Sequence, residues 1–173
     1  MGHIIEFGGN TPSIPETVFV APTASVIGKA TFGDNASAFY GVSVRADTET
    51  ITIGPGTNLQ DNVVVHADPG FPATVGDRVS VGHSAVVHGC TIGNDCLIGM
   101  SATIMNGATI GEGSLVAAGA VVLEGMQVPP RSLVAGVPAK VRRELTDNEL
   151  QDVRDNASRY QELAALHRVA FTS

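Results

Sequence analysis

The chain has 173 residues, 43% of them hydrophobic, and a formal net charge of −7 from 17 acidic and 10 basic residues. No cluster of lysine or arginine offers a footprint for nucleic acid or anionic lipid, and no apolar run approaches the roughly 18 residues of a membrane span. We therefore expect a globular protein with no nucleic-acid or membrane partner. The N-terminal sequence lacks a basic segment followed by an apolar one, which favours the cytoplasm.

Two cysteines, Cys90 and Cys96, are too few for a disulfide framework and lack the two-residue gap of a common zinc pair. We expect both to be reduced thiols that fill small positions in the core. The chain also has 20 glycines, no tryptophan and only 5% aromatic residues. This composition predicts many turns around a core of small branched side chains.

A repeat with a period of six residues runs through the chain. Upstream it is interrupted by an insertion at residues 45–50. It then continues through aliphatic residues spaced by six, with one step of five: Val75, Val81, Val87, Ile92, Ile98, Ile104, Ile110, Val116 and Val122. Six residues rotate an α-helix through about 600°, which would scatter these side chains, whereas short strands around a coil can use the period. The sequence predicts a parallel β-helix built of hexapeptide repeats.

The composition changes after the prolines near residue 130, and residues 145–169 have the pattern of one amphipathic helix. Leu150, Val153 and Ala157 follow one another at steps of three and four. Thr146 and Glu149 form the signature of a capping box at its start. We therefore expect a mainly β fold, with residues 1–143 as the β-helix domain and residues 144–173 as a C-terminal helix packed along its outside.

The tripeptide Val-Val-His occurs twice, ending at His66 and at His88, 22 residues later. Both histidines follow an inward aliphatic residue by one position. If a coil takes three hexapeptides, this separation equals one coil plus a short loop, for which residues 68–72 are a good candidate. His66 and His88 should then stack on adjacent coils, whose strands lie about 4.8 Å apart, where both rings can bind one Zn²⁺.

His83 lies one hexapeptide before His88, so it belongs to a different face of the coil and points away from the pair. In a threefold assembly, His83 of one subunit could meet His66 and His88 of its neighbour. Three neutral imidazoles with an open fourth position are the ligand set of a catalytic zinc, whereas structural sites more often include cysteines. Such a site also accepts Fe²⁺ or Co²⁺, so the native metal stays open.

At these residues the chain resembles the gamma-class carbonic anhydrases. The specific part of the resemblance is the ordered set of motifs R-x-D at Arg45, Q-D-x4-H from Gln60 to His66, and H-x4-H from His83 to His88. The hexapeptide repeats alone are weaker evidence, because acyltransferases share them. The resemblance implies a left-handed β-helix, a homotrimer with three interfacial zinc ions held by these three histidines, and reversible hydration of carbon dioxide to bicarbonate.

The resemblance also assigns roles around the metal. Gln60 would hydrogen-bond the zinc-bound hydroxide and orient it for attack on carbon dioxide. Arg45 and Asp61 would form an ion pair across the subunit interface, with Asp47 in support, and Tyr160 of the C-terminal helix would lie near the pocket. A neutral amide suits the first role because it does not compete for the metal, and arginine binds a carboxylate in bidentate geometry.

Glu49 marks a departure from the family pattern. Better-studied members of the family insert an acidic loop and carry glutamates that move protons from the zinc water to solvent. The corresponding stretch here, ADTETITIGPG, is short, and Glu49 is its only glutamate. We therefore expect slow proton transfer, with solvent or buffer as the carrier.

Two other functions stay open at this point. A hexapeptide acyltransferase or acyl-CoA thioesterase would use one histidine as a base at an interface, so three histidines in ligand register argue against it. A metal-binding scaffold without catalysis would be consistent with the short acidic stretch.

Overall fold

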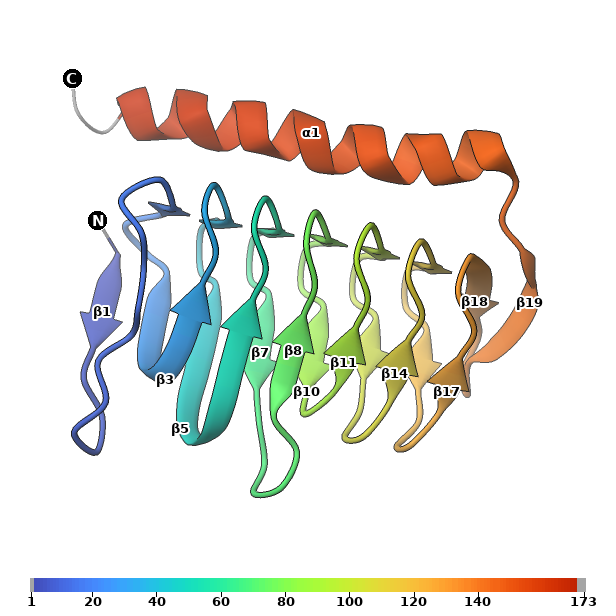
Figure 1. Ribbon diagram of the computed structural model, residues 1–173, viewed down its shortest axis with the longest axis horizontal. Coiled ribbons are helices and arrows are strands. Elements are labelled where there is room, and N and C mark those ends of the chain that lie inside the picture. The colour runs from blue at the N-terminus through green and yellow to red at the C-terminus, as the bar shows by residue number, and fades with distance from the viewer. Residues whose placement is uncertain (1, 171–173) are drawn as a thin grey trace.

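The computed structural model describes residues 2–170, which form a parallel β-solenoid with one long helix beside it (Figure 1). The strands are short because each coil turns from face to face, and they stack into two hydrogen-bonded sheets. The eight-stranded sheet contains β2 (Phe19–Val20), β4 (Ser37–Ala38), β6 (Asn58–Leu59), β9 (Ser80–Val81), β12 (Leu97–Ile98), β15 (Leu115–Val116), β18 (Ser132–Ala135) and the antiparallel β19 (Lys140–Glu144).

The eleven-stranded sheet covers the two other faces, because β3 and β5 pair with strands on both sides of a corner. It contains β1 (His3–Ile5), β3 (Ser25–Phe32), β5 (Ser43–Ile53), β7 (Val64–His66), β8 (Ala73–Val75), β10 (Val86–His88), β11 (Thr91–Ile92), β13 (Thr103–Ile104), β14 (Thr109–Ile110), β16 (Val121–Val122) and β17 (Gln127–Val128).

Inward aliphatic side chains form a ladder on each face. Val44, Val65 and Val87 pair in register from coil to coil, and each is 0% exposed. Val81 and Ile98 pair in the same way in the eight-stranded sheet. Burial of one such side chain stabilises the fold by roughly 1.5–3 kcal/mol. The period of six residues therefore arises, as predicted, from one inward aliphatic side chain on each face of the coil.

Two insertions interrupt the regular coils. In the first, the register between β3 and β5 shifts after Gly28, so that residues 47–50 protrude. Gly28 has a φ of +74°, and a Cβ atom there would lie 2.3 Å from the Ala46 carbonyl oxygen, so only glycine fits. The second insertion is the predicted loop at residues 68–72, which connects β7 to β8 (Figure 1).

The helix α1 (Asp147–Ala170) runs along the solenoid and contacts β2, β6 and β9 (Figure 1). The predicted capping box is present: the Thr146 N–H donates to Glu149 Oε2 at 2.9 Å, and the Glu149 N–H donates to Thr146 Oγ1 at 3.3 Å. One stripe of residues is buried, namely Leu150, Val153, Ala157 and Ala164. The mainly β fold with a C-terminal helix is thus confirmed, while residues 171–173 lie outside the described range.

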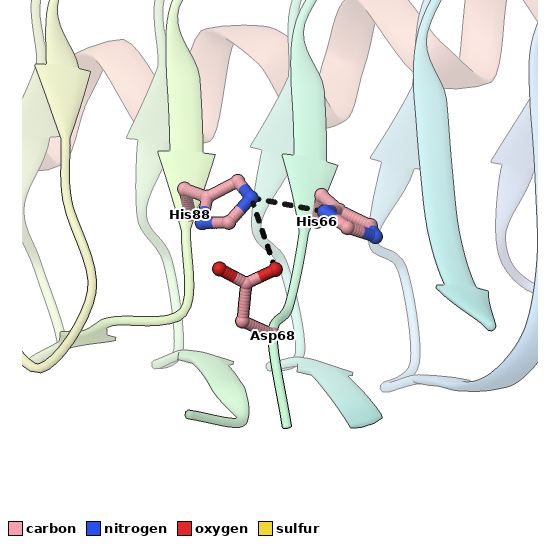
Figure 2. A group of neighbouring side chains, drawn as sticks. All are labelled: His66, Asp68 and His88. Carbon is pink, nitrogen blue, oxygen red and sulfur yellow. Dashed lines mark hydrogen bonds and ion pairs between the residues drawn. The ribbon is translucent and has the colours of Figure 1, made fainter. Parts of the chain in front are cut away.

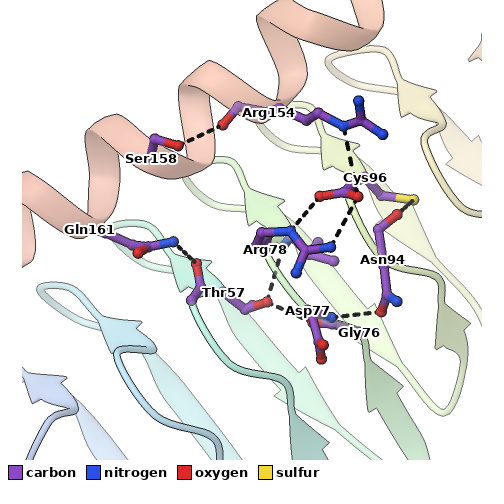
Figure 3. A network of polar contacts seen from close by, with 12 residues as sticks. Thr57, Gly76, Asp77, Arg78, Asn94, Cys96, Arg154, Ser158 and Gln161 are labelled. Atoms are coloured by element: carbon purple, nitrogen blue, oxygen red, sulfur yellow. Dashed lines mark hydrogen bonds and ion pairs between the residues drawn. The ribbon is translucent and has the colours of Figure 1, made fainter.

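A buried carboxylate links α1 to the coils. Arg78 Nε and Nη2 donate to the two oxygens of Asp95 at 2.7 and 3.1 Å, and Arg154 Nε of α1 lies 3.8 Å from Asp95 Oδ2. Figure 3 shows Arg78 on a coil and Arg154 on the helix. The Asp95 side chain is only 7% exposed, so both cations compensate a charge that would be costly alone. This contact joins the helix to two successive coils.

Cys90 and Cys96 are free and buried, as predicted. Burial raises the pKa of both thiols to about 12, so neither is a reactive thiolate at neutral pH. Within residues 2–170, no helix has the length and apolar character that crossing a membrane requires.

Candidate metal centre

His66 and His88 end β7 and β10, which pair in register on adjacent coils. Each histidine follows a buried valine, so its side chain points to the outer face of the sheet. His66 Nδ1 lies 2.9 Å from His88 Nε2, and the ring centroids are 4.9 Å apart (Figure 2). The predicted stacking on adjacent coils is confirmed.

Hydrogen bonds at the opposite ring nitrogens determine where the protons lie. His66 Nε2 lies 3.1 Å from Asp47 Oδ1, and His88 Nδ1 lies 2.7 Å from Asn106 Oδ1. Both oxygens can only accept, so these two nitrogens carry the hydrogens of neutral rings. The facing nitrogens then present two lone pairs 2.9 Å apart, which repel unless a proton or a cation lies between them.

The pair fits a metal ion in its chemistry and its spacing. Metal-ligating histidines commonly donate their second N–H to a carboxylate or a carbonyl, as both rings do here. Tetrahedral Zn²⁺ with Zn–N bonds of about 2.0–2.1 Å would hold two nitrogens about 3.4 Å apart. The rings would therefore separate by only about half an ångström to accept the ion.

Asp47 supports the His66 ring from the insertion in β5, and Arg45, in the regular part of the same strand, supports Asp47. Arg45 Nη1 donates to Asp47 Oδ2 within the same chain. Desolvation raises the pKa of the Asp47 carboxyl, but the hydrogen bonds from Arg45 and His66 outweigh this effect, and the pKa is lowered. An ionised Asp47 therefore holds the ring at neutral pH, while the expected pair of Arg45 with Asp61 across an interface stays a prediction.

Asn106 connects His88 to Asp68. Its Nδ2 donates to Asp68 Oδ2 at 2.9 Å, so its carbonyl oxygen must face His88. Asp68 Oδ1 lies 4.0 Å from His88 Nε2. One donor atom from each of His66, Asp68 and His88 lies within 4.8 Å of the others (Figure 2). A single chain thus presents two imidazoles and a carboxylate on one face.

His83 lies at the corner after β9, where Ser84 turns the chain with a φ of +60°. His83 Nδ1 lies 3.0 Å from Asp61 Oδ2, and His83 Nε2 lies 3.5 Å from the Tyr160 hydroxyl. The carboxylate accepts the Nδ1 proton and leaves Nε2 with a lone pair. Desolvation, together with the charge of Asp61, raises the pKa of Tyr160, so its hydroxyl stays protonated at neutral pH.

The His83 pocket is a hollow of about 370 Å³ between this corner and α1, lined by Gln60, His83, Asn156, Tyr160 and apolar residues of β12 and β15. Gln60 is only 6% exposed, and its Nε2 donates to Asn58 Oδ1 at 3.2 Å, so its amide is fixed. Asn156 Oδ1 is buried and has no hydrogen-bond partner among the described residues. The pocket is therefore apolar with a few oriented polar groups.

The structure divides the predicted residues into two groups. The first group gathers on the face of β5, β7 and β10 and contains Arg45, Asp47, His66 and His88. The second group borders the His83 pocket and contains Gln60, Asp61, His83 and Tyr160. No hydrogen bond or ion pair among residues 2–170 joins the two groups. The three histidines therefore do not meet within one chain, as their register predicts.

Sequence reasoning missed three polar residues near these groups. Asp68 follows His66 by two residues, so it could have been placed beside the same strand. Asn106 follows His88 by one coil of 18 residues, and Asn156 precedes Tyr160 by one helical turn. The coil spacing and the helical spacing in the sequence would have been enough to identify Asn106 and Asn156 as neighbours of the site.

Two family models match the repeats: "Bacterial transferase hexapeptide (six repeats)" over residues 89–124 and "Hexapeptide repeat of succinyl-transferase" over residues 72–100. A protein of Methanocaldococcus jannaschii named "Probable carbonic anhydrase" is 53% identical over 151 residues, which cover 87% of this chain and 95% of that protein. "Gamma carbonic anhydrase 2, mitochondrial" of Arabidopsis thaliana is 41% identical over 91% of this chain, which spans 59% of that longer protein.

A solved structure supports the same fold. The hexapeptide transferase family protein from Anaplasma phagocytophilum superposes with a TM-score of 0.91 at 38% sequence identity, covering 94% of this chain and 96% of that chain. Three findings agree on one family: the sequence motifs, the stacked histidines on a parallel β-solenoid, and the extent of the match to the archaeal and plant relatives. The chain belongs to the gamma carbonic anhydrase family of hexapeptide-repeat proteins.

Proposed function

We propose that the protein hydrates carbon dioxide reversibly to bicarbonate at a Zn²⁺ ion shared between neighbouring subunits of a homotrimer. The observation that carries the proposal is the 2.9 Å distance between His66 Nδ1 and His88 Nε2, two nitrogens that the hydrogen bonds on the far side of each ring leave without a proton. Relatives named carbonic anhydrase, which match most of this chain, support the same reaction. Fe²⁺ or Co²⁺ would also suit a set of three imidazoles.

His83 would complete the ligand set from a neighbouring subunit. Its side chain is 41% exposed at the corner of the solenoid, and Asp61 fixes the tautomer that leaves Nε2 as a ligand. In a closed ring of three subunits, each interface would bring one such corner to one histidine pair. Three protein ligands with an open fourth position are typical of catalytic zinc.

When bound, the metal would supply a nucleophile at neutral pH by lowering the pKa of water. Residues of the chain would then position the reactants. Asn58 holds Nε2 of Gln60 and leaves Oε1 to accept a hydrogen bond from the attacking hydroxide. The apolar side chains of β12 and β15 offer carbon dioxide a surface that suits an uncharged molecule. Tyr160, as a neutral hydroxyl, can donate a hydrogen bond as negative charge develops on oxygen.

A second candidate function is acyl transfer. The 3.0 Å contact between His83 Nδ1 and Asp61 Oδ2 is the arrangement of a general base oriented by a carboxylate. The similar structure named as a hexapeptide transferase family protein favours testing this reaction. Acyl transfer gives no role to the facing ring nitrogens of His66 and His88. We therefore prefer carbon dioxide hydration.

The test is a stopped-flow assay of carbon dioxide hydration with metal-loaded protein, chelator-treated protein and the variant His88→Ala. We expect activity only in the loaded wild type, because the chelator-treated protein lacks the metal and His88→Ala lacks one of its ligands. Equal activity in the chelator-treated sample would refute the proposal. Release of free thiol from acetyl-CoA in the presence of amine acceptors would instead support acyl transfer.

A further inference from the structure

The histidine pair has a third donor on its own chain that the three-histidine set does not use. The Asp68 carboxylate lies beside both rings (Figure 2), with Oδ1 4.0 Å from His88 Nε2. We propose that Asp68 takes the place of His83 when the neighbour's imidazole is absent, so that a single chain can hold the ion through His66, Asp68 and His88. Zinc sites in proteins combine histidine and carboxylate ligands in this way.

The Asn106 amide orients two of these three donors at once. Its carbonyl oxygen accepts the Nδ1 proton of His88, which leaves Nε2 with its lone pair toward the site. Its Nδ2 donates to Asp68 Oδ2, which leaves Oδ1 as the oxygen nearer His88 Nε2. Because one rigid amide fixes both groups, the placement of the carboxylate is tied to that of the imidazole.

The inserted loop at residues 68–72 is itself held against the solenoid. The Phe71 N–H donates to the Asp68 carbonyl oxygen at 2.8 Å and closes a tight turn. Phe71 packs over two glycines of neighbouring coils: a Cβ atom on Gly89 would lie 2.9 Å from Phe71 Cβ, and one on Gly107 would lie 3.3 Å from its ring. These contacts keep Asp68 at the edge of the histidine pair.

The remaining distances are within reach of a side-chain movement. The three donor atoms lie within 4.8 Å of one another, and oxygen ligands bind zinc at about 2.0–2.2 Å, so Asp68 must approach by about 1 Å. Its side chain is 46% exposed, so there is space for this movement. A carboxylate also places a negative charge next to a divalent cation, which two neutral imidazoles do not.

The inference rests on the metal position of the proposed function, but not on its reaction. The experiment is therefore a titration of metal-free protein with Co²⁺, followed by visible absorption, for the wild type and the variants His83→Ala, Asp68→Ala and their combination. We expect His83→Ala to bind one Co²⁺ per chain. Adding Asp68→Ala to it should weaken binding by at least about tenfold, because only two imidazoles remain.

In the wild-type background, Asp68→Ala should change Co²⁺ affinity little, since three imidazoles still hold the ion. Asp68→Asn in the His83→Ala background should weaken binding as Asp68→Ala does, although the amide still accepts the hydrogen bond from Asn106. The matched control is Asp152→Asn, an exposed carboxylate of α1, which should leave affinity unchanged. Circular dichroism verifies that each variant keeps the solenoid.

Equal Co²⁺ affinity of His83→Ala with and without the change at Asp68 would overturn the inference. Loss of all binding in His83→Ala alone would overturn it as well. If the metal does not bind at the histidine pair at all, His66→Ala will bind Co²⁺ as the wild type does. This result is distinct from those that concern Asp68. Metal binding without carbon dioxide hydration would refute only the proposed function.

Discussion

The side chain of Gln60 has an orientation that the fold itself sets. Its amide is almost fully buried and is held by Asn58, whose own Nδ2 donates to Ser80 Oγ at 3.0 Å. Asn58 and Ser80 occupy paired positions on adjacent coils, so the solenoid itself sets the orientation of the amide. Such preorganised groups contribute to catalysis without reorganising during the reaction.

The variant Gln60→Ala should lower kcat/KM for carbon dioxide about tenfold, or about 1.4 kcal/mol of transition-state stabilisation. Metal content should not change, because Gln60 is not a ligand. Stopped-flow hydration kinetics and metal analysis check both expectations. Gln151→Ala on the exposed side of α1 is the control, and an unchanged kcat/KM in Gln60→Ala would contradict the assigned role.

Glu49 is the only glutamate of β5, and its carboxylate accepts a hydrogen bond from the Thr50 N–H at 2.9 Å. This hydrogen bond lowers the pKa of Glu49, which makes it a weak proton acceptor near neutral pH. We therefore predict that kcat rises with the concentration of imidazole buffer at constant pH and ionic strength. Glu49→Gln should show the same dependence, whereas a wild-type kcat indifferent to buffer would point to a proton carrier within the protein.

At the residue scale, the sequence predicts the stacked histidines better than their surroundings. His66 and His88 share a register position, and register follows directly from the period of six residues. Asp68 lies in an inserted loop, whose path is set by the packing of Phe71 over glycines of two other coils. That contact joins distant parts of the chain and leaves no periodic signal.

The helix α1 depends on polar contacts at its N-terminal end. Arg143 Nη1 and Nη2 donate to the two carboxylate oxygens of Glu149 at 2.8 and 2.7 Å, and Thr146 adds its backbone N–H. The hydrogen bond from Arg143, together with those from Thr146, lowers the pKa of Glu149 from its ordinary 4.5 to about 2. The carboxylate therefore stabilises the folded helix end only while it is ionised.

A lowered folded-state pKa stabilises the fold above the unfolded value, and this stabilisation is lost as pH falls through the folded value. We predict that the stability of α1 falls between pH 4.5 and about 2, the window set by Glu149. Glu149→Gln should reduce the pH dependence of the helical circular dichroism signal in this window. Glu162→Gln, an exposed glutamate of the same helix, should keep it. An equal pH dependence in both variants would contradict the assignment.

The strands and the helix can both be predicted from the sequence, but for different reasons. The strands follow from one inward aliphatic residue per hexapeptide, and α1 follows from its capping box and its apolar spacing. The contact of Asp95 with Arg78 and Arg154 was not predicted, because Asp95 lies on a coil and Arg154 lies on the helix. Sequence spacing alone does not show how the helix is aligned with the coils.

At the scale of the whole molecule, the solenoid separates the candidate ligands. It stacks His66 on His88 along one face and places His83 at a corner with Asp61 and Tyr160. His83 and His88 are separated along the sequence by much less than one coil. They therefore lie on different faces of the solenoid, whereas residues one coil apart would stack. A site that uses all three imidazoles therefore requires a second subunit, and we expect sedimentation to show a trimer.

The most direct test of this account combines two variants that each lack a different part of the shared site. His83→Ala subunits keep the histidine pair, and His66→Ala subunits keep His83, so a mixed trimer has intact sites where the two kinds meet. Equal amounts, unfolded together and refolded, should form intact sites at about a quarter of the interfaces and recover carbon dioxide hydration in proportion. A mixture no more active than its two parents, in trimers shown to be mixed, would contradict a metal site shared between subunits.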